Sequence, residues 1–342
     1  MTQRRPVKLL GILLALGAVP AALPLAACDT GVFAAGSTIG VMRRASPGVQ
    51  RMRDPDILEQ AFPASIQQLE GLLEVKPDDA VGRAMLARSY ASYGYGFLED
   101  HYEAAQRSDD ATEEQIEHWR ERASQAYLRG REVALEQLDR AHPEDGGFMA
   151  SQHAGLDAFN AHLARFTNAS DDGPLLFWVA YNWARYIGLH RDDMSAIADV
   201  AYVRAIADRA AALDPTYMDR GPVALRAGLL AAAPPALGGR PDEAKAALDE
   251  VIAATGRRNL LYLVTEAQLC AVPLQDRALF QSLLEEVLAF DVNAYPEQRI
   301  PNLLAQRRAR RYLDQIDDLF VPVDDAAAGD GSEGDASGGA SE

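Results

Sequence analysis

Apolar residues recur every three to four positions along most of the chain, from about residue 54 to residue 320. One run keeps this spacing through several turns: Leu58, Phe62, Ile66, Leu69 and Leu73. This period places the apolar side chains on one face of an α-helix, whereas a half-buried strand would alternate with a period of two. No run of alternating β-branched residues competes with it. The pattern therefore predicts an all-α domain over residues 54–320.

Further stretches with helical spacing lie at 116–138, 149–166, 203–213, 244–252 and 280–287. The stretch "LLFWVAYNWARYIGL" is apolar nearly all round, which is typical of a helix buried on most sides. Clusters of Pro, Gly and Asp separate these stretches and predict the loops between them.

Three stretches also match the second helix of a helix-turn-helix repeat of about 34 residues. Both "SIQQLEGLLEVKP" and "VRAIADRAAALDP" place an apolar or small residue five positions before a proline, and "GRPDEAKAALDEVIAATG" repeats the spacing of the earlier positions. Small residues let paired helices approach, and the proline ends the helix. We therefore predict a tetratricopeptide-repeat-like solenoid or bundle of roughly ten or more helices. A general helical bundle with coincidental turns is the alternative.

The first 27 residues have the build of a signal peptide. Arg4, Arg5 and Lys8 precede an apolar run that is too short for a comfortable membrane span. The residues Leu25–Cys28 resemble the lipobox of bacterial lipoproteins. That resemblance implies cleavage before Cys28 and attachment of palmitate-type acyl chains, which would anchor the protein to a membrane surface. An ordinary signal peptide that happens to contain a cysteine is the alternative.

Two segments flank the helical domain. Residues 28–53 begin with the modified cysteine, are rich in Gly, Ser, Ala and Arg, and show no long periodic pattern, so we expect a tether that makes first contacts with the domain. Residues 321–342 are acidic and rich in Gly, Ser and Ala, which predicts a disordered tail because they have little apolar surface to bury. The net charge is −17, and removal of residues 1–27 takes away three positive charges and leaves −20. This acidity argues against nucleic-acid binding.

The sequence contains no motif for catalysis or metal binding. The six histidines form no pair with zinc-protease spacing, the acidic pairs lack the spacing of a calcium loop, and no phosphate-binding glycine loop is present. Cys270 stands in an apolar context that is typical of a buried thiol. We therefore expect no enzyme, no cofactor and no metal. A hydrolase built from acids distant in the sequence is a less favoured hypothesis, because spatial neighbours cannot be inferred from spacing.

Aromatic residues are better candidates for a binding site. Tyr90 and Tyr93 share one helical face, and Trp178, Asn182 and Trp183 belong to a second dense patch. Core packing is the commoner role of such stripes, and an aromatic cleft for a small ligand is the alternative. Two glycines, at 94 and 96, lower helix propensity beside the first stripe, which would make sense if a neighbouring helix or a ligand comes close.

The stretch "RIPNLLAQRRARRYLDQIDDLF" predicts an amphipathic helix near the end of the domain. Pro301 suits its first turn, and the arginines occupy the flanks and the side opposite the apolar stripe. Cations come early and anions late, which is unfavourable for the helix dipole. Arg310 and Arg311 are therefore candidates for contacts with a partner or a second subunit. A solvated polar face is the alternative.

This terminal stretch also resembles the C-terminal signature of the T component of TRAP (tripartite ATP-independent periplasmic) transporters. Other stretches agree with that family in the same order, among them "SYASYGYGFLEDH", "FWVAYNWARYIGL", "RAAALDPTYMDRGP" and "PPALGGRPDEAKAAL". The resemblance covers roughly residues 54–320.

The resemblance implies a periplasmic, tetratricopeptide-repeat-containing lipoprotein that lacks a catalytic motif. It further implies association with the substrate-binding component of the transporter, a homo-oligomer, and a cleft for a small ligand of apolar character. The lipid would anchor the protein to the inner or the outer membrane. A repeat lipoprotein that scaffolds envelope assembly or secretion is the alternative function.

Overall fold

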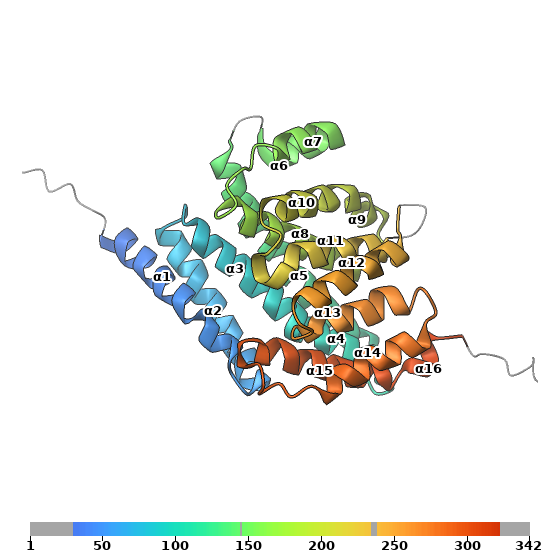
Figure 1. Cartoon of the computed structure of the whole chain (residues 1–342). Helices are drawn as coiled ribbons and strands as arrows, with labels where there is room; N and C mark the ends of the chain where they lie inside the picture. The colour runs from blue at the N-terminus through green and yellow to red at the C-terminus, as the bar shows by residue number, and fades with distance from the viewer. Residues whose placement is uncertain (1–29, 144–145, 234–237, 322–342) are drawn as a thin grey trace, which may run out of the picture.

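The computed structural model describes residues 30–143, 146–233 and 238–321, which form an all-α fold (Figure 1). No strand occurs in these three ranges, and the prediction of an all-helical protein is confirmed. Cys28, the signal peptide and the tail from residue 322 onward lie outside the described residues.

The helices follow one another through short connections. Their bounds are α1 Thr30–Gln50, α2 Pro55–Val75, α3 Ala80–Tyr93, α4 Glu99–Ala105, α5 Glu113–Ala141, α6 Gly147–His153, α7 Leu156–Leu163, α8 Asp172–Leu189, α9 Met194–Ala198, α10 Val200–Leu213, α11 Tyr217–Ala232, α12 Pro241–Ala254, α13 Leu260–Glu266, α14 Arg277–Ala289, α15 Arg299–Leu313 and α16 Ile316–Leu319. Two π-helices and a short 3-10 helix connect some of them: η1 Gly94–Leu98, η4 Ala267–Ala271 and η5 Pro296–Gln298.

The three stretches that matched the repeat pattern form α2, α10 and α12. Each packs against a helix that precedes it, in the pairs α1–α2, α8–α10 and α11–α12. Helices α2 and α10 also pack on the helix that follows, as expected of stacked helix pairs. The predicted turn residues lie between helices, with Pro77 after α2 and Pro215 after α10.

Local chemistry explains where these helices begin. Asp54 caps α2 by accepting from the backbone N–H groups of Asp56 and Ile57, and Pro55 occupies the first turn. Thr112 and Gln115 form a reciprocal capping box at the start of α5. These caps satisfy backbone donors that have no partner within the helix.

Helices α3, α5 and α8 form the centre of the largest apolar core. Helices α5 and α8 come close at Gly130 and Asn182, where a Cβ atom on Gly130 would lie 2.7 Å from the Asn182 Oδ1 atom. Asn182 is fully buried and donates to the carbonyl oxygens of Ala87 and Trp178. A side chain larger than hydrogen at position 130 would therefore push α5 and α8 apart.

The last long helix, α15, packs against the helices at the beginning of the domain. In Figure 1, α15 lies beside the lower ends of α1 and α2. Arg299 donates to the carbonyl of Arg51 at 2.5 Å, and Arg307 pairs with Asp56 at 3.0 Å. Helix α15 is thus in direct contact with α1 and α2 at the beginning of the domain.

Two segments differ from the pattern-based expectation. Most of the segment expected as a tether is the helix α1, with Ala35 and Ile39 buried. The spacing at 149–166 predicted a single helix, but the structure divides it into α6 and α7 at Gly155, whose φ of 103° lies in the left-handed region.

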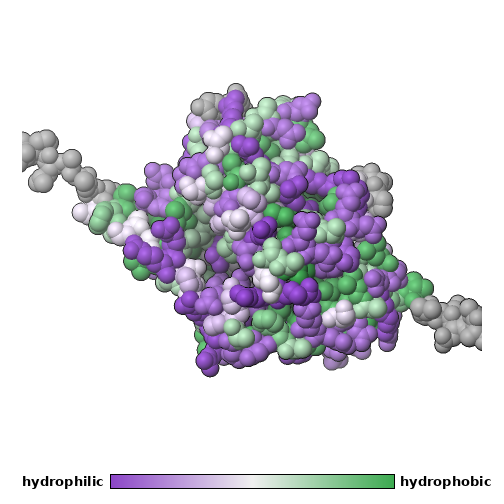
Figure 2. Space-filling model, in the orientation of Figure 1, coloured by the Kyte–Doolittle hydropathy of each residue, from purple (hydrophilic) through white to green (hydrophobic). Residues whose placement is uncertain are grey.

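The visible surface is mostly hydrophilic (Figure 2). Apolar residues gather over α13 and α14, at the lower right of the view. None of the described helices combines the length and the apolarity needed to cross a bilayer.

Candidate functional site

A π-helical turn interrupts the passage from α3 to α4. It comprises Gly94–Leu98, and such wide turns inside α-helices occur frequently at functional sites. A Cβ atom on Gly94 would lie 2.8 Å from the ring of Tyr127, and one on Gly96 would lie 3.1 Å from Leu304. The expected close approach at these glycines is confirmed, and its cause is the neighbouring helices α5 and α15.

The side chain of Tyr95, in the middle of η1, lies between two arginines. Arg308 of α15 is 3.8 Å from the ring centroid, and Arg185 of α8 is 4.7 Å from it. Arg308 also donates to the carbonyl of Tyr95 at 2.7 Å. One aromatic ring therefore connects three segments that are distant in the sequence, through cation–π contacts.

Carboxylates at the start of α4 neutralise these arginines. Glu99 is buried, pairs with Arg185 and accepts a hydrogen bond of 2.5 Å from the Tyr127 hydroxyl. Glu103 lies 3.5 Å from the Nε atom of Arg308. Charges inside a protein are tolerated when they are paired in this way. We call Tyr95, Glu99, Arg185, Arg308 and the acids that contact them the inner cluster.

Arg185 faces a space that solvent reaches. Its side chain is 32% accessible, yet burial in the surrounding protein lowers its pKa to about 10. Tyr181, one turn earlier on α8, is also partly accessible while burial raises its pKa. Arg185 and Tyr181 are thus surrounded by protein and still reach water. Both properties are expected of side chains on the inner side of a closed array of helices.

Next to the inner cluster, α8 and the start of α11 form an aromatic face: Phe177, Trp178, Tyr181 and Tyr217. The ring of Phe177 contacts the other three, at centroid distances of 4.7, 6.0 and 5.6 Å. Trp178 donates its Nε1 hydrogen to the Tyr217 hydroxyl at 3.0 Å. Phe177 and Trp178 are only 4% and 5% accessible, whereas Tyr181 and Tyr217 are partly exposed. The aromatic face is the candidate ligand site, at which only the two tyrosines could meet a ligand directly.

A left-handed turn follows Tyr217. Met218, Asp219 and Arg220 have φ values of 47°, 60° and 67°, and the right-handed part of α11 begins only after them. This conformation costs an L-residue roughly 1–2 kcal/mol. Tyr262 holds the turn by donating to the carbonyl of Asp219 at 2.8 Å. Strained backbone of this kind is concentrated at ligand-binding and switch segments.

The five residues predicted as ligand contacts do not converge on one space. Tyr90 donates to Glu70 at 2.9 Å, and the ring of Tyr93 lies 5.7 Å from that of Phe62, so both pack towards α2. The remaining three are on α8 and are at most 5% accessible: Trp178, Asn182 and Trp183. Of the five, only Trp178 belongs to the aromatic face.

Trp183 lies on a different side of α8 from Trp178. The guanidinium of Arg131 is 4.8 Å from the centroid of its ring, and its own side chain is 4% accessible. Five helical positions separate the two tryptophans, which turns them by about 140° relative to each other. Both tryptophans are therefore buried in the core, Trp178 beside Tyr217 and Trp183 beside Arg131.

Helix α15 is rich in arginines, some of which are buried in the protein while others are exposed to solvent. Arg311 pairs with Asp100 at 2.6 Å and with Glu103 at 2.5 Å, within the same chain. Arg310 is exposed. Arg308 is 1% accessible, and the spacing did not single it out. Its position on the same helical face as Ala305 and Tyr312, both buried, is the signal that could have found it.

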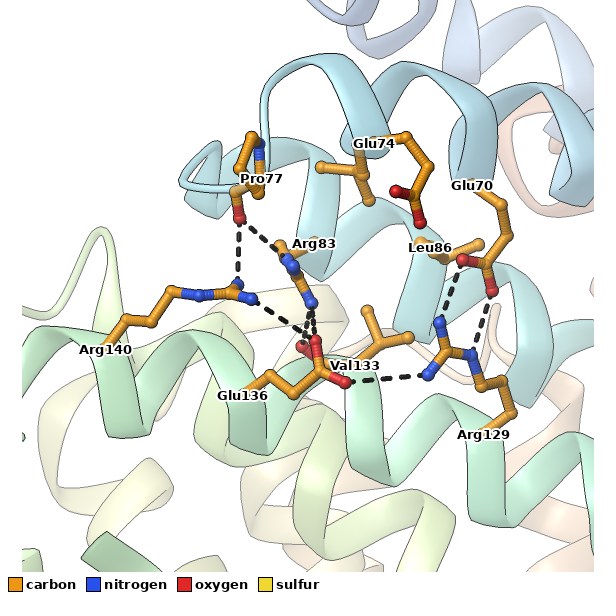
Figure 3. Close-up of a pocket in the computed structure, with 10 residues that line it drawn as sticks. Glu70, Glu74, Pro77, Arg83, Leu86, Arg129, Val133, Glu136 and Arg140 are labelled. Atoms are coloured by element: carbon orange, nitrogen blue, oxygen red, sulfur yellow. Dashed lines mark hydrogen bonds and ion pairs between the residues drawn. The ribbon is translucent and has the colours of Figure 1, made fainter. Parts of the chain in front are cut away.

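A polar hollow of about 190 Å³ lies between α2, α3 and α5 (Figure 3). Arg129 donates to both carboxylate oxygens of Glu70 at 3.0 Å, while Arg83 and Arg140 both donate to the carbonyl of Pro77. The charges in this hollow are paired with one another, so it leaves no free cation for a ligand. A second hollow, of about 370 Å³, lies beside the end of α5 and the start of α8. Neither hollow includes the aromatic face.

Within the described ranges, no group of three or more His, Cys, Asp or Glu residues could hold a metal ion. Cys270 is fully buried, and burial raises the pKa of its thiol to about 12, so the reactive thiolate is disfavoured.

The fold and the site together define an all-helical protein of stacked helix pairs, with arginines and aromatic residues on its inner side. Comparison with known proteins specifies the class. The sequence matches the profile of the TRAP transporter T-component family over residues 51–320, and the chain belongs to this family. An uncharacterized protein of Treponema pallidum (strain Nichols) is 28% identical over 271 residues, covering 78% of this chain and 81% of that protein. The family is an accessory component of a transport system and not a family of enzymes.

Proposed function

We propose that this protein is a lipid-anchored, periplasmic accessory component of a TRAP-type uptake system. In this role it associates with the substrate-binding component and holds a small ligand against the aromatic face. The observation that carries the proposal is the family match, which spans nearly all of the described helices. Stacked helix pairs also suit this role, because they expose extended surfaces to partner proteins.

The position of α1 determines how close an anchored domain would lie to the membrane. This helix begins at Thr30, two residues after Cys28. Two residues span at most roughly 7 Å, so acyl chains on Cys28 would hold the start of α1 at the membrane surface. Three acyl chains bind a bilayer firmly, whereas one binds only marginally. The folded domain would then stand directly on the membrane, without a long tether.

Co-purification from the native bacterium tests the association. The full-length chain, tagged at its C-terminus, is cross-linked in cells, isolated, and its partners are identified by mass spectrometry. We expect the substrate-binding component of a TRAP transporter, encoded near this gene. Recovery of outer-membrane assembly factors alone would instead support the scaffolding function and reject the transport role.

A Cys28→Ser variant tests the anchor separately. We expect the native chain in the membrane fraction, with acyl chains on its N-terminal peptide, and the variant in the soluble periplasmic fraction or uncleaved. An unmodified thiol at position 28 in the native protein would reject the anchor, while the association with a transporter could still hold.

A further inference from the structure

Helix α1 exposes two large apolar side chains on one side. Phe33 is 75% exposed and Val41 is 62% exposed. They are eight positions apart, which places them about 80° from each other around the helix axis. The helix packs on α2 and α15 through its other side, where Ala35 and Ile39 are buried. In Figure 1, α1 lies at the edge of the array of helices, so its outer side faces away from the rest of the described protein.

The other positions on this outer side are small or basic. Ala34, Ser37 and Gly48 are exposed there. Arg44 follows Phe33 by eleven positions, about 20° from it around the axis. Its Nε atom donates to the carbonyl of Gly40 at 3.2 Å, which leaves the terminal N–H groups of the guanidinium directed to solvent. The outer side thus combines apolar side chains with a cation and has no bulky acid between them.

The segment that contains α1 is strongly basic, although the protein is acidic. Residues 30–53 include four arginines and no Asp or Glu, so their charge is +4. The chain without residues 1–27 has a charge of −20, so the rest of it carries −24. Arg51 pairs with Glu297. The other three arginines, Arg43, Arg44 and Arg53, are exposed and pair with no acid among the described residues.

This charge distribution favours one kind of surface as the occupant of the outer side of α1. Anionic phospholipids give a bilayer a negative surface potential that attracts arginines next to a membrane anchor. The same potential repels the acidic remainder of the chain, so it would turn α1 towards the bilayer. Helix α1 begins two residues after Cys28, which is close enough for its whole outer side to reach a bilayer that holds that cysteine. Apolar and basic side chains together are also typical of helices that lie in the membrane interface.

We propose that the outer side of α1, with Phe33, Val41, Arg43 and Arg44, lies on a bilayer surface that contains anionic phospholipids. Phe33 and Val41 enter the interface, and the two arginines contact lipid phosphate groups. The inference rests on the membrane anchor of the proposed function and adds to it a protein surface and a lipid class. Acyl chains alone hold one end of α1 and leave the domain free to tilt, whereas contact along the helix fixes its orientation.

Tryptophan quenching in vesicles tests the contact. The full-length Phe33→Trp chain is inserted into preformed vesicles of brominated phosphatidylcholine, with or without brominated phosphatidylglycerol. Bromine quenches only a tryptophan that reaches the lipid, and the native chain supplies the background of its own tryptophans. We expect strong quenching of the introduced tryptophan in the anionic vesicles and much less in the neutral ones. Met194→Trp is the matched control: Met194 is 77% exposed on α9, which packs on α10, and its replacement should not be quenched in either.

Removal of charge tests the role of the arginines. Arg43→Gln with Arg44→Gln, added to Phe33→Trp, should lower the ratio of bilayer-bound to free α1 at least about tenfold in the anionic vesicles. Arg191→Gln with Arg310→Gln removes the same charge at exposed positions outside α1 and should leave the quenching unchanged. Raising the ionic strength should weaken the quenching, because salt screens the surface potential. The thermal unfolding midpoint of each variant should equal that of the native chain, since all these side chains are exposed.

The mass of the N-terminal peptide, measured before insertion, keeps the anchor and the α1 contact separate. An acylated chain whose introduced tryptophan is not quenched would overturn the contact and leave the anchor standing. If Cys28 is unmodified, quenching at high vesicle concentration would support the contact without an anchor, and its absence would reject both. Equal quenching in neutral and anionic vesicles would refute the selection of anionic lipid. Absence of quenching with a lower mass of Phe33→Asp in light scattering would assign the outer side of α1 to a second copy of the chain.

Discussion

Arg308 packs its guanidinium 3.8 Å from the centroid of the Tyr95 ring and donates to the carbonyl of the same residue at 2.7 Å. This contact joins α15, near the end of the domain, to the π-helical turn near its beginning. Burial alone would lower the pKa of Arg308, but the charges of Glu103 and Asp100 hold it well above its ordinary value. The contact between α15 and η1 thus depends on buried charges that compensate one another.

Arg308→Met should therefore destabilise the protein strongly. The substitution leaves the negative charges of Asp100 and Glu103 without part of their compensation, and loss of one member of a buried ion pair costs about 3–5 kcal/mol. Urea unfolding measures this change. Arg310→Met, on the exposed side of the same helix, should change the free energy of unfolding by less than about 0.5 kcal/mol. Equal effects of the two variants would show that the inner cluster does not stabilise the contact between α15 and η1.

Charge reversal at the two predicted partner contacts should separate their roles. Arg311→Glu places a third carboxylate against Asp100 and Glu103, and we expect a loss of stability seen as a lower urea midpoint. Arg310→Glu should leave the midpoint unchanged. If Arg310 contacts a second subunit, this variant should lower the mass measured by light scattering. An unaltered mass would count against that contact, and neither variant should acquire affinity for DNA.

Trp183→Ala should lower the free energy of unfolding by about 3–5 kcal/mol, because it removes a large side chain that is 4% accessible. Met194→Ala, at a side chain that is 77% exposed, is the matched control and should be nearly neutral. The sequence pattern also allowed Trp183 to be a ligand contact. A stability loss below about 1 kcal/mol combined with lost ligand binding would restore that role.

Arg220→Gly should raise stability by about 0.5–1 kcal/mol. Arg220 is exposed and has a φ of 67°, a conformation that glycine adopts without strain. Arg191→Gly, at an exposed residue without positive φ, should lower stability or leave it unchanged, because glycine only adds freedom to the unfolded chain there. Thermal unfolding compares the two. A lower melting temperature for Arg220→Gly would mean that the left-handed turn carries little strain.

Glu266→Gln should raise stability, increasingly so at higher pH. Burial, followed by the negative charge of Asp249, raises the pKa of Glu266 in the folded state. A raised folded-state pKa contributes stability that is present below the unfolded value of about 4.3 and is lost as pH rises through the folded value. The variant removes this loss, and Lys245 keeps Asp249 as its partner at 2.8 Å.

Urea midpoints between acidic and neutral pH test this dependence. The difference between variant and native chain should be small at low pH and grow as pH rises. Glu285→Gln, at an exposed position on α14, should give a constant difference near zero. A difference that does not change with pH would show that Glu266 titrates normally.

The helical fold could be predicted because burial of an apolar stripe leaves a local, periodic trace. Val203, Ile206 and Ala210 are buried on α10 as their spacing predicts. Helix α1 was not predicted, because it buries only Ala35 and Ile39 and therefore has almost no periodic apolar stripe. The break between α6 and α7 was not predicted either, because the apolar spacing continues across Gly155 while the helical backbone does not.

The candidate site was predicted only in part. Trp178 was singled out by its aromatic surroundings, and it does belong to the aromatic face. Arg185 and Arg308 were missed, because a helical arginine has the same local pattern whether its tertiary partner is water, a carboxylate or an aromatic ring. The glycines beside Tyr95 were the useful local signal, since they cost helix propensity and so indicated close packing.

The amino-acid sequence by itself determined the helices, most of the loops and the family to which the chain belongs. These follow from periodicity, turn residues and motifs, all of which act over a few neighbouring positions. Only the tertiary structure decided which of the described arginines are paired and which are not, because pairing depends on side chains brought together from α3, α4, α8 and α15. Arg83 and Arg88 show this most plainly: they lie five residues apart on one helix, and Arg83 pairs with Glu136 while Arg88 makes no hydrogen bond or ion pair with another described residue.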